Sequence, residues 1–170
     1  MEIIELIMAI ATAAMAVATF WLVFESRRAS FRQIGVQTWL ELEKRFDSQE
    51  MKKARKNLAR HLKAYDPEKH DKISETVLNF FESVGIAHKE KYLDHKLADS
   101  SFSFHACRWW EAAKPYVDQE RKRQDDDDSM FEDFQNFAKL MRRPNEKIDD
   151  LHLQRFLDDE ERLTLEIASP

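Results

Sequence analysis

The sequence predicts an all-α protein, with one N-terminal transmembrane helix continued into a cytoplasmic bundle of about four to five helices. The first observation behind this is composition: among 170 residues there are two glycines and four prolines, and helix-forming residue types dominate. The second is an apolar stretch, Ile3–Phe24, followed by strongly polar sequence. We therefore expect an anchor at residues 1–25, a bundle at 26–143, and a short helix and tail at 144–170.

The apolar stretch reads IIELIMAIATAAMAVATFWLVF, with Glu5 and two threonines as its polar residues. As a helix it extends about 33 Å at about 1.5 Å per residue, enough for a hydrocarbon core of roughly 30 Å. A cleaved signal peptide is the competing interpretation. It would begin with basic residues and have a shorter apolar core of about 7–15 residues. A retained membrane anchor is therefore the expectation.

The basic residues Arg27, Arg28 and Arg32 follow the apolar stretch, and none precedes it. Lysine and arginine close to a span favour the cytoplasmic side of a membrane. The expected location is the bacterial inner membrane, with the N-terminus outside and the C-terminal domain in the cytoplasm. Glu5 is expected at the membrane interface, where a carboxylate reaches water.

The net charge of −5 hides a strong asymmetry along the chain. Residues 25–65 carry eleven bases against five acids, and residues 66–170 carry sixteen bases against twenty-five acids. The basic part could contact anionic headgroups or could be an ordinary solvated helix face. The candidate membrane-surface residues are Arg27, Arg28, Arg32, Lys52, Lys53, Lys56, Arg60 and Lys63.

Small residues recur at helical spacing within the apolar stretch, at Ala9, Ala13 and Ala16. Such a face lets helices approach closely in a membrane. The sequence thus favours either packing of this helix against another one or simple tolerance of alanine in lipid.

Apolar residues at intervals of three and four predict the remaining helices. The first helix is expected to continue over 26–46, and further helices are expected at about 50–65, 71–87, 129–143 and 149–157. A helix between 71–87 and 129–143 is expected to begin at Asp94 or Asp99 and to bend at Pro115, one turn before its end. The segment RKRQDDDD at 121–128 reads as a solvated loop. In the helix that begins at Ser129, the inward residues are expected to be Phe131, Phe134, Phe137, Leu140 and Met141.

Scattered residues of this helical part form a recognisable order. They are Phe81-Glu82-x-x-Gly85, Trp110, Lys114-Pro115-Tyr116, Arg121 and Phe131-Glu132-x-Phe134. In this order the chain resembles a bacterial family of single-span membrane proteins with a small helical cytoplasmic domain, domain of unknown function 4760, over roughly residues 1 to 141. The resemblance implies this architecture and no catalytic residue.

Metal-binding residue types occur without a coherent ligand set. His105 and Cys107 are two apart and would point to nearly opposite faces of a helix, so Cys107 reads as a buried structural residue. Asp149 and His152 share a helix face, which favours a surface ion pair. The run Asp125–Asp128 lacks the alternation and glycine of a calcium loop. No cofactor and no metal are therefore expected.

Arg55 and His61 could form a catalytic pair. An arginine and a histidine a few positions apart on a bundle helix resemble the loose active-site motif of HEPN-type ribonucleases. Paired cations of this kind stabilise a phosphate in transition. The segment RKNLARH is strongly basic, however, so both residue types would occur there without a catalytic role.

The expected function is a non-catalytic, membrane-anchored interaction, scaffold or accessory-subunit protein. Its expected partners are the lipid bilayer and a membrane or cytoplasmic protein, or further copies of the same chain, and no nucleic acid. One alternative is a membrane-tethered HEPN-like RNase or toxin-type effector using Arg55 and His61. The other is a module that responds to anionic lipid.

Overall fold

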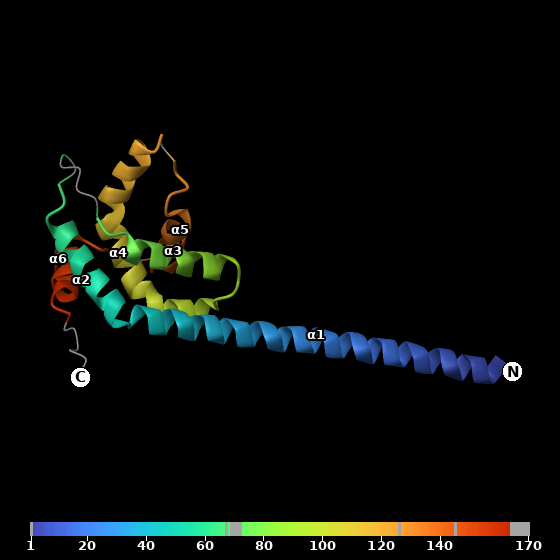
Figure 1. The fold of residues 1–170 in the computed structure, drawn as a ribbon. Helices are drawn as coiled ribbons and strands as arrows, with labels where there is room; N and C mark the ends of the chain where they lie inside the picture. The colour runs from blue at the N-terminus through green and yellow to red at the C-terminus, as the bar shows by residue number, and fades with distance from the viewer. Residues whose placement is uncertain (1, 67, 69–72, 126, 145, 164–170) are drawn as a thin grey trace.

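The computed structural model describes residues 2–66, 68, 73–125, 127–144 and 146–163. These residues form α-helices and no strand, which confirms the all-α prediction. The helices are α1 (Glu2–Phe46), α2 (Gln49–Lys63), α3 (Thr76–Lys89), α4 (His95–Arg123), α5 (Glu132–Met141) and α6 (Asp150–Glu161). Figure 1 shows α1 as a long rod whose C-terminal part lies against a bundle of the other helices.

The predicted transmembrane helix is wrong. Within the residues that the structure describes, no helix has the combined length and apolarity that a membrane span requires. Much of Ile3–Phe24 is alanine and threonine, which carry far less apolar surface than leucine or isoleucine. The helix does continue past the apolar stretch through charged sequence to Phe46, in agreement with the predicted continuation over 26–46. The predicted orientation across the membrane depended on that span.

The C-terminal third of α1 attaches the rod to the bundle. Phe46 is buried in the core, and Trp39 and Leu42 pack against it. The indole Nε1 of Trp39 donates to Ser101 Oγ on α4 at 2.9 Å. Ser101 Oγ in turn donates to Glu43 Oε1 at 2.8 Å, so the two helices are joined by a short chain of hydrogen bonds.

Aromatic rings fill the centre of the bundle. Phe46 lies within 5.4 to 6.1 Å, centroid to centroid, of the rings of Phe80, Phe81 and Phe102. Phe81 also stacks on Phe134 of α5 at 5.1 Å. Edge-to-face and stacked contacts of this kind add to the free energy gained from burial alone. The apolar stripes predicted for the third and fifth helices therefore meet in one core.

α3 and α5 approach each other closely at Gly85. A Cβ atom built on Gly85 would lie 2.3 Å from the carbonyl oxygen of Asp133, which is backbone and cannot rotate away. Glu82, one turn earlier on α3, accepts the backbone N–H groups of Asp133 and Phe134 at 3.3 and 2.7 Å. The N-terminus of α5 is thus capped by a side chain of α3, since Phe131 at its N-cap position makes no side-chain cap.

α4 differs from its prediction at the C-terminal end. Its start is capped by Asp94, which is one of the two predicted capping residues. Asp94 Oδ1 accepts the N–H of Lys96 at 2.9 Å. The helix continues through Pro115 to Arg123, about one turn beyond the predicted end. Arg121, predicted in a solvated loop, is buried and donates through Nη2 to Met130 O at 2.6 Å and through Nη1 to Gln135 Oε1 at 3.0 Å. These bonds tie the end of α4 to the start of α5.

α5 buries its predicted apolar stripe with one exception. Phe131, Phe134, Phe137 and Met141 are buried, but Leu140 is 57 % exposed. The last helix, α6, is capped by Asp149 and packs along α2. Its own residues Phe156 and Leu157 are buried. Residues 150–161 therefore belong to the bundle and are not a separate tail.

Candidate interaction surface

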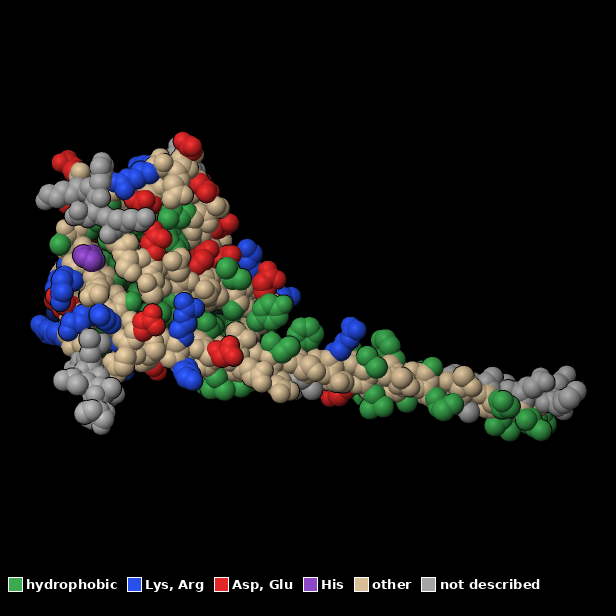
Figure 2. Space-filling view, viewed as in Figure 1, with side chains coloured by type: hydrophobic (Ala, Val, Ile, Leu, Met, Phe, Trp, Pro, Cys, Tyr) green, Lys and Arg blue, Asp and Glu red, His purple; other side chains and the backbone are tan. Residues whose placement is uncertain are grey.

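The first half of α1 presents a long uncovered apolar surface. Phe20 is 74 % exposed, and the neighbouring large side chains are exposed as well. Figure 2 shows such side chains along the rod beyond the bundle. We call this the α1 surface; its large members are Ile3, Ile4, Ile7, Met8, Met15, Val17, Phe20, Trp21, Leu22, Val23 and Phe24. Many large apolar side chains left exposed on one helix are typical of an interaction site.

The alanine face predicted for helix packing lies on the same part of α1. Ala16 is exposed and belongs to the uncovered rod. The side chains of Ala9 and Ala13 lie outside the described part of the structure. Their role in close helix packing therefore stays a prediction.

A groove opens where α1 leaves the bundle. It encloses about 1020 Å³, at the upper end of the roughly 300–1,000 Å³ typical of small-molecule sites. Its walls come from α1, the C-terminal end of α3 with the loop after it, the start of α4, and α5. Apolar side chains dominate these walls: Phe31, Val36, Leu93, Leu97, Phe137 and Leu140. We call it the α1–α5 groove.

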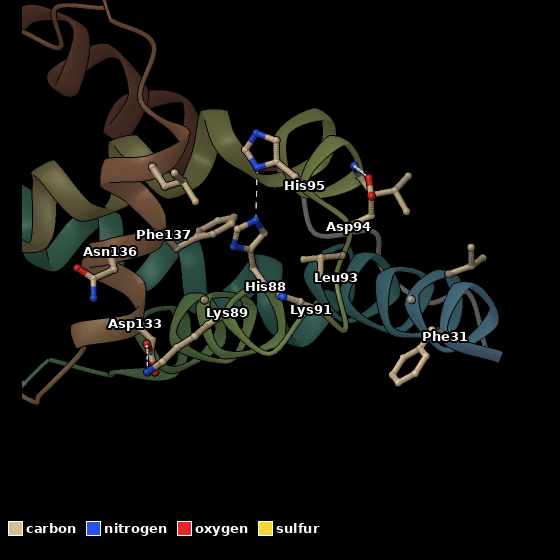
Figure 3. A pocket seen from close by; sticks show the side chains of 15 residues that line it. Phe31, His88, Lys89, Lys91, Leu93, Asp94, His95, Asp133, Asn136 and Phe137 are labelled. Carbon is tan, nitrogen blue, oxygen red and sulfur yellow. Dashed lines mark hydrogen bonds and ion pairs between the residues drawn. The ribbon is translucent and has the colours of Figure 1, made fainter. Parts of the chain in front are cut away.

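Two histidines face each other at one wall of this groove. Figure 3 shows His88 and His95 pointing toward one another, with His95 Nδ1 and His88 Nε2 3.4 Å apart. The His88 ring also lies 5.6 Å from the Phe137 ring, centroid to centroid. Burial lowers the pKa of His88, and the neighbouring His95 lowers it further. Sequence reasoning missed this pair, because the two residues stand on different helices and only the turn at 90–94 brings them together.

The predicted basic face of α2 lies largely against α6. Lys63 Nζ contacts Asp158 Oδ1 at 2.6 Å and Glu161 Oε2 at 2.9 Å, and hydrogen bonds to these acids raise the pKa of Lys63. Arg60 Nε reaches Glu161 Oε1 at 3.3 Å. Acidic residues of the C-terminal part thus pair with basic residues of α2, so part of the charge asymmetry along the sequence is compensated within the fold.

The remaining candidate basic residues have mixed positions. Arg27 and Lys53 are exposed, and Lys52 is half-buried. Lys56 Nζ donates to Leu163 O at 3.5 Å. The side chains of Arg28 and Arg32 lie outside the described residues. Fewer of these cations are therefore available to an anionic surface than the sequence alone indicates.

Arg55 and His61 are not brought together as a catalytic pair would be. Arg55 is buried, and its Nε and Nη2 donate to the two carboxylate oxygens of Glu160 at 2.8 and 2.7 Å. Its guanidinium carbon also lies 4.2 Å from the centroid of the Phe46 ring. His61 is exposed. A guanidinium already held by a carboxylate and an aromatic ring is poorly placed to bind phosphate.

The other candidate ligands also have structural roles. Cys107 is buried, with Sγ 3.4 Å from Ala138 O, while His105 lies 3.5 Å from Glu160. His152 Nδ1 and Asp149 Oδ1 form the predicted surface ion pair at 2.7 Å. In the Asp125–Asp128 run, Asp127 accepts the N–H of Ser129 at 2.9 Å, and Asp126 lies outside the described residues. Across the described residues, no group of three or more histidine, cysteine, aspartate or glutamate side chains could hold a metal ion.

The fold and this surface define a small helical-bundle protein with one long projecting helix. The model of a family described as a domain of unknown function, DUF4760, matches residues 6–142, and the chain belongs to that family. This confirms the resemblance seen in the sequence. No curated protein and no solved structure matches the chain.

Several of the residues that carry the family resemblance lie around the start of α5, whereas Tyr116 donates to Glu75 Oε1 elsewhere in the bundle. Phe81 stacks on Phe134, and Trp110 meets the same Phe134 ring edge-on at 5.3 Å. Gly85 lies against Asp133, as described above, and Glu82 caps α5. Arg121 on α4 donates to Met130 O and Gln135 Oε1 at the same helix end. These members of the pattern therefore share a packing role around one helix end.

Proposed function

We propose that this protein is a non-catalytic interaction protein, a scaffold or accessory subunit, that docks on a partner protein through the α1 surface. The observation that carries the proposal is the long apolar rod that the bundle leaves uncovered. Burying apolar surface stabilises a complex by about 25 cal/mol per Å² of area removed from water. A helix packed along this rod would therefore remove the free-energy cost of keeping its apolar side chains in water. Either a helix of a different protein or α1 of a second copy of this chain could pack there.

The bundle supports this proposal by fixing α1 at one end. Trp39, Leu42 and Phe46 hold the base of the helix, and the hydrogen bonds through Ser101 set its direction. A rod held in this way loses little further conformational entropy when it docks, which favours affinity.

The experiment compares Phe20→Lys with Leu151→Lys. Leu151 on α6 is 58 % exposed and away from α1, so it is a matched control for adding a charge at an exposed apolar site. The full chain purified in gentle detergent should give a complex of fixed stoichiometry by light scattering. Phe20→Lys should dissociate it and Leu151→Lys should not. A monomer at every detergent concentration, or equal effects of the two variants, would contradict the proposal.

The two alternative functions receive less support from the geometry. The burial and pairing of Arg55 oppose the ribonuclease hypothesis, and equal RNA profiles in cells expressing the wild type and His61→Ala would remove it. The pairing of Arg60 and Lys63 with α6 weakens the anionic-lipid hypothesis. Location at the bacterial inner membrane stays a prediction. A partner protein in that membrane would be enough to hold the chain there. Cell fractionation tests it.

A further inference from the structure

We propose that the α1–α5 groove binds a single-chain amphipathic anion of the fatty-acid class, with its carboxylate at Lys91 and the His88–His95 pair and its alkyl chain along the apolar wall. This goes beyond the proposed function, because it concerns a ligand site and not the α1 surface.

The apolar wall accounts for the alkyl chain. Phe31 is 64 % exposed although it sits beside the bundle, and Leu140 on the opposite wall is the residue of the α5 stripe that fails to be buried. Leu93 and Phe137 are buried beneath them. A groove with a buried apolar floor and exposed apolar rims suits a flexible hydrocarbon chain, which removes these rims from water.

The polar end accounts for the anionic head. Two carboxylates line the groove, and both are engaged: Asp133 holds Lys89 Nζ at 2.8 Å, and Asp94 accepts the backbone N–H groups of Lys96 and Leu97. Within the described residues, no ion pair is found for Lys91. The groups left to meet a ligand are therefore the Lys91 ammonium, the Asn136 amide and the ring nitrogens that the His88–His95 hydrogen bond does not use. The ammonium and the amide are donors, and a neutral imidazole donates through its one N–H.

The loop between α3 and α4 holds these donors together. Lys91 takes a left-handed conformation with φ of 61°, and the next two backbone N–H groups, of Tyr92 and Leu93, both donate to Ala87 O at 2.9 and 3.0 Å. This closes the end of α3 in a tight turn. The turn brings His95 over His88 and sets Lys91 beside them at the groove (Figure 3).

The test uses the full chain in nonionic detergent and a photoreactive dodecanoate analogue. Sites of crosslinking are mapped by mass spectrometry, and unlabelled dodecanoate, dodecanol and dodecyltrimethylammonium compete. We expect labels on the groove residues, displacement by dodecanoate, and at least tenfold weaker competition by the neutral and cationic amphiphiles. Labels confined to residues 3–24, or equal competition by the three heads, would overturn the proposal.

Two variants and a control separate binding from folding. Lys91→Gln should weaken binding at least tenfold, whereas Lys122→Gln, at an exposed lysine at the far end of α4, should leave it unchanged. Gly35→Leu should block the groove, because a Cβ at Gly35 meets nothing closer than Tyr92 O at 3.5 Å. Unchanged circular dichroism and melting temperature would show that these variants fold.

Other results would also decide against the site. Full binding by both Lys91→Gln and Gly35→Leu would place the amphiphile elsewhere. Displacement of the probe by a copurified protein, with no displacement by dodecanoate, would assign the groove to a partner helix instead.

Discussion

At the scale of single residues, the two glycines of the chain have opposite environments. Both lie in helices, where alanine is favoured over glycine by up to about 1 kcal/mol. At Gly85 that preference is overridden, because a Cβ would meet backbone atoms of Asp133 at 2.3 and 2.6 Å. At Gly35 the nearest atom is at an ordinary contact distance of 3.5 Å.

We therefore expect Gly85→Ala to destabilise the protein by about 1–3 kcal/mol, the usual range for overpacking a tight contact. Gly35→Ala should leave stability unchanged or raise it by up to about 1 kcal/mol. Chemical denaturation of the two variants beside the wild type measures both. Equal stabilities for the two variants would contradict the close approach of α3 and α5.

His105 gives a second residue-scale prediction, on pH. Burial, together with the nearby charges of Arg55 and Arg108, lowers the pKa of His105 from 6.5 to about 4. Glu160 lies 3.5 Å from its Nε2 but is already neutralised by Arg55. In the unfolded chain His105 protonates near pH 6.5, so between pH 6.5 and 4 the unfolded state binds the proton first.

Stability should therefore be complete above pH 6.5 and fall as the pH drops toward 4. His105→Gln cannot take up this proton, so relative to the wild type it should gain up to about 3 kcal/mol over that interval. Urea titrations at pH 7, 5.5 and 4 measure the difference. Parallel pH profiles for the two proteins would show that the environment of His105 is not the one described.

At the scale of helices, α2 and α6 are joined by one buried and several exposed ion pairs. The buried pair, Arg55–Glu160, is bidentate. Removing one partner of such a pair leaves a buried charge unpaired, which costs about 3–5 kcal/mol. An exposed pair contributes about 0–1 kcal/mol. The two kinds of pair should thus respond very differently to the same substitution.

Glu160→Gln should destabilise the protein by about 3–5 kcal/mol, and Glu161→Gln, at the surface pairs with Arg60 and Lys63, by less than about 1 kcal/mol. Combining Arg55→Met with Glu160→Leu should restore stability to near the wild-type value, because no unpaired charge remains. Thermal and urea unfolding provide the measurement. A double variant no better than Glu160→Gln would mean that packing, not charge, sets the cost.

The same helices show what the sequence could predict and what it could not. Periodicity located the buried faces of α3 and α5 because Val77, Phe81 and Phe134 repeat at helical intervals. It could not show that Leu140 faces a groove, since that depends on where α1 passes. It placed Arg121 in solvent because a basic run usually is solvated. The partners that bury it are Met130 O, in the turn before α5, and Gln135 on α5.

The candidate site was predicted less well than the fold. The apolar stretch of α1 was evident, but its interpretation as a membrane span rested on length, and the described residues do not reach the required apolarity. The His88–His95 pair depends on the geometry of the turn between α3 and α4, and the α1–α5 groove depends on contacts between elements distant in sequence. No spacing rule could find them.

At the scale of the whole molecule, the chain divides into a bundle with its own core and a rod. Among the side chains of α1 that the structure describes, none before Trp39 belongs to that core. The contacts that stabilise the bundle involve the end of α1, and the apolar residues before Glu25 whose side chains the structure describes are exposed. Stability and association should therefore be separable by position along a single helix.

Deleting residues 2–24 makes this separation measurable. The shortened chain keeps Trp39, Leu42 and Phe46, so its melting temperature should match that of the full chain within a few degrees, because the core loses no buried side chain. Its association, followed by light scattering, should be lost together with the α1 surface. A shortened chain that fails to fold would show that the rod stabilises the bundle. One that still associates would move the interaction site to the bundle itself, because the surface proposed for docking would be gone.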